Sequence, residues 1–174
     1  MEKTEVIEGV GAFPVGHWHS SASTQPLDWD KITTGEILPT VPWTLEQYEN
    51  VLFCFFSEVR HDRYLKNTLS GVAMPVTALW ASFSHLSSKY EVGPIIDVEH
   101  HFRFFRNLKP GETTVLSGSI TAKYEKKSHF YIEWETKCHS TKEEQIFTFN
   151  HTIIDLREAS VSYTHLTLPT IYSV

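Results

Sequence analysis

The sequence predicts an α+β fold in which an antiparallel sheet wraps around one central helix. Two observations carry this prediction: a buried-helix pattern between Leu69 and Tyr90, and a series of strand patterns that follows it. In the first segment, apolar side chains recur every three or four residues, which places one wide apolar stripe along a helix. The stripe comprises Val76, Leu79, Trp80, Phe83, Leu86 and Tyr90. Small residues occupy the other positions, so a sheet could approach this helix closely.

Loops, one strand and a further helix are expected before the central helix. Residues 1–34 carry Gly, Pro and Ser at irregular intervals and predict an N-terminal arm with loops. Residues 35–43 predict a short edge strand, because their two prolines would be costly in a central strand. Thr44 and Gln47 form a capping-box pattern ahead of a helical apolar stripe. A polar connection, residues 57–70, then leads to the central helix.

Four strand patterns follow the central helix. They cover residues 95–105, 114–124, 130–139 and 145–156. The third alternates most cleanly, since Ile132 and Trp134 lie on one face and Glu133 and Glu135 on the other. One central helix followed by long antiparallel strands is typical of the hot-dog fold, which we expect as a single domain over residues 35–157.

The composition restricts the partners and the compartment. The chain of 174 residues has a formal net charge of −6, which disfavours nucleic acid and anionic membrane surfaces as main partners. Its two cysteines, Cys54 and Cys138, are expected to be buried free thiols. No apolar run is long enough to span a bilayer and no signal-peptide pattern precedes the first turns, so we expect a cytoplasmic protein.

The last segment, residues 161–174, resembles translated sequencing-adaptor DNA. We therefore expect it to be a non-native tail and exclude His165 from the candidate chemistry.

Two motifs support a family resemblance. Residues 71–77, GVAMPVT, open the central helix, and residues 104–113, FFRNLKPGET, join two strands. The first is similar to the glycine-to-helix turn of MaoC-like hydratases and dehydratases, and the second resembles the strand-to-turn signature of that family. The resemblance covers about residues 35–157. It implies a hot-dog fold, a homodimer or a heterodimer with a related hot-dog chain, and an acyl thioester substrate. Coenzyme A or a carrier protein's pantetheine arm would carry the acyl chain, and no resident cofactor is implied.

The reaction that the resemblance implies is hydration of a 2-enoyl thioester, or dehydration of a 3-hydroxyacyl thioester. It requires a base, an acid and hydrogen-bond donors for the enolate oxygen. The start of the central helix can supply the donors, because the first N–H groups of a helix lack partners within it. The candidate substrate-binding residues of this turn are Gly71, Ala73, Met74, Val76 and Thr77. The alternative is that Gly71 and Pro75 only shape the turn.

The candidates for acid and base lie between the two helices. The family places an Asp and a His five residues apart in this connection, and residues 57–64 contain no such spacing. In one interpretation, Glu58, His61 and Asp62 form a rearranged catalytic group. In the other, the loop is a solvated charged connection, and the protein is a non-catalytic acyl-thioester-binding subunit. A thioesterase is the nearest alternative enzyme, since the same fold positions a carboxylate for hydrolysis.

The strand at residues 95–105 carries basic and aromatic side chains. Arg103 and Arg106 form a basic patch suited to the phosphates of coenzyme A, and the alternative is ordinary charge pairing with Glu99 or Glu112 across the sheet. Aromatic side chains give both faces of this strand apolar cover, which favours a dimer.

Histidines offer few further candidates. His100 and His101 are neighbours on a strand and point to opposite faces, so one is expected to face the central helix. His17 and His19 alternate around Trp18, but no Cys or carboxylate lies at ligand spacing nearby. We therefore expect a surface loop there and no metal site.

Overall fold

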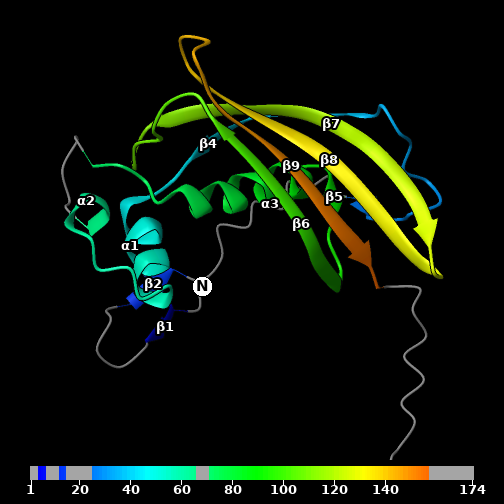
Figure 1. Ribbon diagram of the computed structural model, residues 1–174, viewed down its shortest axis with the longest axis horizontal. Helices are drawn as coiled ribbons and strands as arrows, with labels where there is room; N and C mark the ends of the chain where they lie inside the picture. Colours follow the sequence, from blue (N-terminus) through cyan, green and yellow to red (C-terminus); the bar gives the residue numbers. More distant parts are fainter. Residues whose placement is uncertain (1–3, 7–11, 15–24, 66–70, 157–174) are drawn as a thin grey trace, which may run out of the picture.

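The computed structural model describes residues 4–6, 12–14, 25–65 and 71–156. A five-stranded sheet has the order β4-β7-β8-β9-β6, and every neighbouring pair is antiparallel. Its strands are β4 (Ile37–Thr44), β6 (Ile95–Phe104), β7 (Thr113–Lys126), β8 (His129–Ser140) and β9 (Gln145–Asp155). The sheet curves around the helix α3 (Ala78–Ser87), as Figure 1 shows. The predicted α+β architecture is therefore confirmed.

Small side chains of α3 face the sheet. The helix packs on β4, β7, β8 and β9. Its buried residues are Ala78, Ala81, Ser82, His85 and Leu86. Most of the predicted apolar stripe is only half-buried. Large side chains between the helix and the sheet would hold the two apart, so they extend along the flanks of the helix instead. The observed helix is also shorter than the predicted one. Its first predicted turn is the 3₁₀ turn η1 (Pro75–Thr77), and Tyr90 belongs to the strand β5 (Tyr90–Glu91) that follows α3.

The first helix, α1 (Gln47–Phe56), begins later than its predicted cap. The capping box is formed by Glu46 and Glu49, and the Glu46 N–H donates to the Glu49 carboxylate at 2.8 Å. The predicted capping box of Thr44 and Gln47 is therefore wrong, because two such patterns overlap in the sequence and Thr44 still belongs to β4. A short helix, α2 (Asp62–Leu65), lies in the predicted polar connection.

Part of the predicted N-terminal arm packs into the core. Leu27 and Ile32 are buried together with side chains of α3 and the sheet. The short strands β1 (Thr4–Val6) and β2 (Ala12–Pro14) pair antiparallel, and β3 (Gln25–Pro26) pairs parallel with β5. His17, His19, His165 and the tail 161–174 lie outside the described residues.

The two cysteines are buried and free, as the sequence predicts. Cys54 lies on α1 and Cys138 on β8. Within the described part of the chain, no helix combines the length and apolar character needed to cross a membrane.

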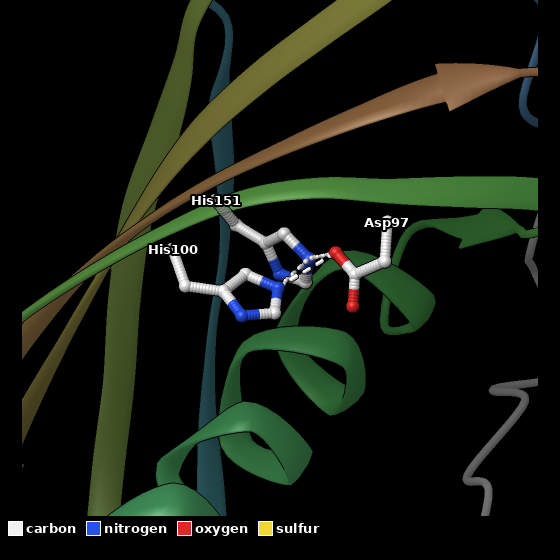
Figure 2. Close-up of side chains that lie close together, drawn as sticks. All are labelled: Asp97, His100 and His151. Carbon is white, nitrogen blue, oxygen red and sulfur yellow. Dashed lines mark hydrogen bonds and ion pairs between the residues drawn. The ribbon is translucent and has the colours of Figure 1, made fainter.

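A bulge interrupts the edge strand β6. Asp97 lies opposite Ile153 of β9 and Glu99 lies opposite Thr152, so Val98 is an extra residue between them. An extra residue shifts the alternation of side chains by one position. Asp97 and His100, three residues apart, consequently share the face of the sheet that looks toward α3 (Figure 2).

Candidate functional site

The two motifs meet at the N-terminal end of the central helix. The Ala73 N–H, in the turn before α3, donates to the carbonyl oxygen of Leu108 at 2.8 Å. Leu108 belongs to the connection between β6 and β7, and both residues are buried. The turn at residues 71–74 is thus held against the second motif.

Asn50 of α1 holds the same turn from the other side. Its side-chain oxygen accepts the Met74 N–H at 2.8 Å, and its side-chain N–H donates to the Tyr64 carbonyl oxygen at 2.8 Å. Asn50 is fully buried. The connection between α1 and α3 is therefore fastened beside the start of the central helix, and the Met74 N–H is already in use.

The backbone N–H groups next to Pro75 differ in whether they already have a hydrogen-bond partner. The Thr77 N–H donates to the Met74 carbonyl at 2.9 Å, and the Thr77 hydroxyl donates to the same oxygen at 2.6 Å. Pro75 has no N–H. Among the residues that the structure describes, the Val76 N–H has no hydrogen-bond partner. Of the backbone N–H groups of Met74, Val76 and Thr77, that of Val76 is therefore the one that remains available to a ligand.

Glu58, His61 and Asp62 lie together in the exposed connection after α1. Glu58 adopts a left-handed backbone conformation with φ of 55°, and Asp62 begins α2. The His61 Nδ1 accepts the Arg63 N–H at 3.1 Å. No hydrogen bond or ion pair joins the Glu58 and His61 side chains in this described segment. The structure thus places the three candidates in one loop without forming an acid–base pair between Glu58 and His61.

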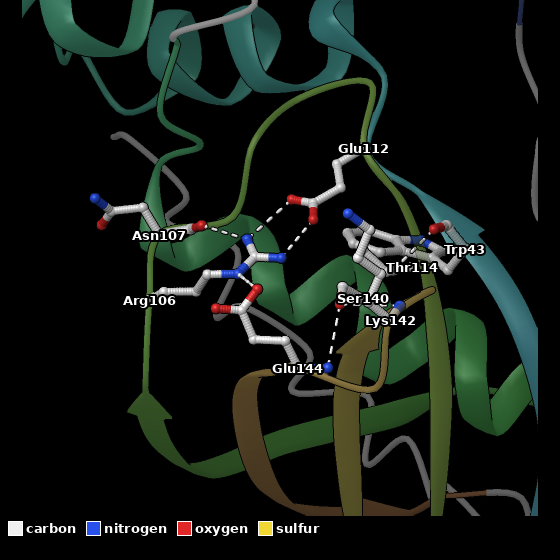
Figure 3. A network of polar contacts seen from close by, with 8 residues as sticks. All are labelled: Trp43, Arg106, Asn107, Glu112, Thr114, Ser140, Lys142 and Glu144. Carbon is white, nitrogen blue, oxygen red and sulfur yellow. Dashed lines mark hydrogen bonds and ion pairs between the residues drawn. The ribbon is translucent and has the colours of Figure 1, made fainter.

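Arg106 is held by two carboxylates (Figure 3). Its guanidinium binds Glu112 through two nitrogens, and its Nε donates to Glu144 at 2.9 Å. A further N–H donates to the Asn107 carbonyl oxygen at 2.9 Å. The pairing with Glu112 that the sequence left open is therefore present. Arg103 is exposed, with its guanidinium carbon 5.1 Å from the centre of the Phe105 ring.

A second constellation, Asp97, His100 and His151, lies between β6, β9 and α3 (Figure 2). Asp97 Oδ1 is 2.5 Å from His151 Nε2 and 2.7 Å from His100 Nε2, and the two nitrogens are 3.2 Å apart. The Ser82 hydroxyl of α3 lies 3.2 Å from His151 Nδ1. Burial lowers the pKa of His151 to about 4, against the opposing effect of Asp97, so its imidazole is neutral near pH 7.

Sequence reasoning missed this constellation as a group. The prediction that His100 and His101 diverge holds, since His100 turns toward α3 and the side chain of His101 is 68% exposed. His151 lies directly opposite His100 in the register of β6 and β9, and a register prediction could have revealed that pair. The bulge that brings in Asp97 leaves no comparable signal in the sequence.

Comparison with known proteins finds similarity to solved structures but no match by sequence. No protein-family model matches the sequence, and no curated protein matches it. An R-hydratase from Pseudomonas aeruginosa superposes with a TM-score of 0.60 at 14% identity, over 76% of this chain and 87% of that chain. A MaoC-like dehydratase from Rhodospirillum rubrum gives a TM-score of 0.56 at 13% identity, over 72% and 94%. The chain has the hot-dog fold.

A third solved structure with this fold is a 3R-hydroxyacyl-ACP dehydratase complex from Mycobacterium tuberculosis. It gives a TM-score of 0.57 at 15% identity, over 68% of this chain and 93% of that chain.

Within the hot-dog domain described here, the Val76 N–H lies at the start of the wrapped helix. Ser82, which contacts the Asp97, His100 and His151 constellation, lies further along the same helix. Polar groups therefore lie at two places, one in η1 directly before α3 and one along α3 itself.

Proposed function

We propose that this protein is an acyl-thioester hydratase or dehydratase acting on 2-enoyl or 3-hydroxyacyl chains. The observation that carries the proposal is the Val76 N–H, which lies in the 3₁₀ turn directly before the wrapped helix α3 and has no partner among the described residues. The fold shared with an R-hydratase and with a 3R-hydroxyacyl-ACP dehydratase supports it. Coenzyme A or an acyl carrier protein would carry the acyl chain, and no resident cofactor is needed.

In the proposed reaction, the thioester carbonyl accepts a hydrogen bond from the Val76 N–H. This bond, together with the positive end of the helix, stabilises the enolate oxygen that develops as water adds across the double bond. A base removes a proton from water while its oxygen bonds to C3, and an acid then protonates C2. Glu58, His61 and Asp62 are the proposed acid and base, because their loop is fastened beside the helix start through the Tyr64 carbonyl and Asn50.

The phosphates of the carrier require a cationic surface. Arg103 is the better candidate, because it is exposed and no ion pair with a carboxylate holds it within the described residues. Arg106 would have to exchange the carboxylates of Glu112 and Glu144 for a phosphate. We therefore assign the phosphate contact chiefly to Arg103, with Arg106 as the residue that positions the adjoining turn.

The proposed assembly is a dimer, with a second copy or with a related hot-dog chain, joined along β6. This strand is an edge of the sheet and pairs on one side only, with β9. Its exposed apolar side chains, with the residue that follows the strand, are Ile96, Val98, Phe102, Phe104 and Phe105. A second strand would satisfy the free backbone edge and cover these side chains. Light scattering on the eluting protein tests this, since one chain has a mass of 20.0 kDa.

Turnover of a 2-enoyl-CoA tests the assignment of the site. We expect His61→Ala and Glu58→Ala to lower kcat about 100-fold or more, as loss of a general acid or base does. His129→Ala, an exposed histidine at the start of β8, is the matched control and should leave kcat unchanged. Hydratase activity that survives both loop substitutions would falsify the assignment. Release of a free thiol instead of water addition would identify a thioesterase.

A non-catalytic acyl-thioester-binding subunit is the second candidate. The exposure of Glu58 and His61, without a bond between their side chains, favours it. In this case an acyl-CoA would raise the melting temperature of the protein, because a ligand that binds only the folded state stabilises it. The same acyl-CoA would remain unchanged when product formation is followed by mass spectrometry.

A further inference from the structure

Asp97, His100 and His151 converge on one point at the edge of the sheet, and we infer that they bind a divalent first-row transition metal ion, such as Zn²⁺. Each residue offers one ligand atom, and the three atoms all lie within 4.8 Å of one another. Two imidazole nitrogens with one carboxylate oxygen suit zinc or a neighbouring transition metal rather than Mg²⁺ or Ca²⁺, which prefer oxygen ligands alone.

The backbone builds this convergence. His100 and His151 are direct partners across the antiparallel pair of β6 and β9, so their side chains lie side by side on one face. On a regular strand Asp97 would point away from His100. The bulge at Val98 reverses the alternation and turns the carboxylate toward the two imidazoles (Figure 2). Bulges that redirect a side chain in this way are concentrated near functional sites.

The separations are close to those of a metal site. The two Nε2 atoms are 3.2 Å apart. Two nitrogens bound to a tetrahedral zinc at about 2.0 Å are separated by about 3.3 Å. Asp97 Oδ1 lies closer, at 2.5 Å and 2.7 Å from the nitrogens, and would move outward by roughly 0.8 Å to reach ligand spacing. The Asp97 side chain is 36% exposed and has room for this movement.

Neighbouring side chains orient the buried ligand. The Ser82 hydroxyl lies 3.2 Å from His151 Nδ1, and the Trp134 ring stacks on the His151 imidazole with centroids 4.1 Å apart. A hydrogen bond from Nδ1 to Ser82 leaves the lone pair of Nε2 directed at the shared point, as in metal sites where a second contact fixes the tautomer. His151 is fully buried, so its ring is held in place before any metal arrives.

The opposite side of the constellation is open. The side chains of His100 and Asp97 are 30% and 36% exposed. Three protein ligands with an open side leave at least one coordination position for water or for an oxygen atom of another ligand, which is the arrangement of catalytic rather than structural zinc sites. A titration with metal distinguishes a bound ion from hydrogen bonds among the three side chains alone.

Isothermal titration calorimetry with Zn²⁺ tests the inference. The untagged chain is first treated with EDTA, and the titration contains no acyl thioester. We expect one site per chain, and His100→Ala and Asp97→Asn should each weaken it about 100-fold or more. His101→Ala and Glu99→Gln are matched controls, because these neighbours pair with each other at 3.0 Å and are 68% and 60% exposed. Both controls should bind Zn²⁺ within about threefold of the parent chain, as expected for residues that are not ligands.

Three further measurements support the interpretation of the titration. Ser82→Ala should weaken Zn²⁺ binding by about 10- to 100-fold, the usual effect of removing the partner of a ligating histidine. Zn²⁺, but not Mg²⁺, should raise the melting temperature of the parent chain, and this rise should be absent in His100→Ala. A double variant, His17→Ala with His19→Ala, should retain binding.

Three results would overturn the inference. These are less than one Zn²⁺ bound per parent chain, unchanged binding in His100→Ala and Asp97→Asn, or loss of binding in the His17 and His19 double variant alone. The titration contains no thioester, so its outcome is separate from that of the hydratase assay.

Discussion

The side-chain oxygen of Asn50 accepts the backbone N–H of Met74 at 2.8 Å, across 24 positions of sequence. The same side chain donates to the Tyr64 carbonyl oxygen. One buried amide thus joins the first helix, the loop that carries Glu58, His61 and Asp62, and the turn that begins the wrapped helix.

Asn50→Leu is expected to destabilise the protein by about 2–3 kcal/mol, because it leaves the Met74 N–H and the Tyr64 carbonyl without their partner. Urea denaturation measures the free energy of unfolding. Asn107→Leu is the control, since the Asn107 side chain is exposed and should change stability by less than about 0.5 kcal/mol. Equal effects of the two substitutions would show that the Asn50 bonds contribute nothing specific.

Gly118→Ala is expected to be severely destabilising. A Cβ at this position of β7 would lie 1.9 Å from the Glu135 carbonyl oxygen of β8, a backbone atom that cannot move without parting the two strands. We expect a loss of more than about 3 kcal/mol, or failure to fold, as seen when overpacking disrupts a core. Gly111→Ala provides the comparison, because a Cβ there meets nothing within 4 Å and only its φ of +78° is unfavourable, at about 1 kcal/mol. Comparable melting temperatures for the two variants would contradict this expectation.

The two carboxylates that hold Arg106 should differ in their contribution. The Glu112 side chain is 22% exposed and binds two guanidinium nitrogens, whereas that of Glu144 is 63% exposed and binds one. We expect Glu112→Gln to cost about 1–2 kcal/mol and Glu144→Gln less than about 0.5 kcal/mol, because water screens the exposed pair. Double-mutant cycles with Arg106→Gln measure each coupling, and a larger coupling to Glu144 would refute the ranking.

His85 should make stability depend on pH in a defined window. It is fully buried, its Nε2 donates to the Pro39 carbonyl at 3.0 Å, and its Nδ1 lies 3.0 Å from the Thr136 hydroxyl. Burial lowers the pKa of His85 from 6.5 to about 4, so on acidification the unfolded chain takes up the proton first. The contribution of neutral His85 to the free energy of unfolding is complete above about pH 6.5. It is lost as the pH falls toward 4, and the loss amounts to at most about 3 kcal/mol.

Urea denaturation between pH 7 and pH 4 tests this expectation. His85→Gln can still donate to Pro39, but it has no imidazole to protonate. Its free energy of unfolding should therefore fall less steeply with decreasing pH than that of the parent chain. The difference in slope should correspond to the uptake of about one proton fewer on unfolding. Identical slopes in the parent chain and the variant would exclude His85 as the source.

The strands were predictable because their side chains alternate. Ile132, Trp134, Thr136 and Cys138 are all buried on one face of β8, as the sequence indicates. The central helix was predictable from its apolar spacing, but not the face that it buries. Closeness to a curved sheet favours Ala78 and Ala81 over Trp80 and Phe83, and only the tertiary packing decides this.

The candidate site was less predictable, because its contacts join residues far apart in sequence. No local pattern indicates that Asn50 takes the Met74 N–H and leaves that of Val76 available. Glu58, His61 and Asp62 were chosen only because they lie between the two predicted helices. The directions of their side chains depend on the left-handed backbone of Glu58 and on the short helix α2, which no sequence pattern indicated. Asp97 was missed because spacing rules assume regular alternation, which β6 does not keep.

Val98 sets the spacing between Asp97 and His100. On a regular strand, side chains two positions apart share a face, and the bulge extends this interval to three. A chain that lacked both residue 98 and the bulge would keep the carboxylate on the side of the two imidazoles, whereas a regular strand that retained residue 98 would turn it to the opposite side. Among related genes, we therefore expect the aspartate codon either two positions before the histidine codon or, where the bulge is present, three.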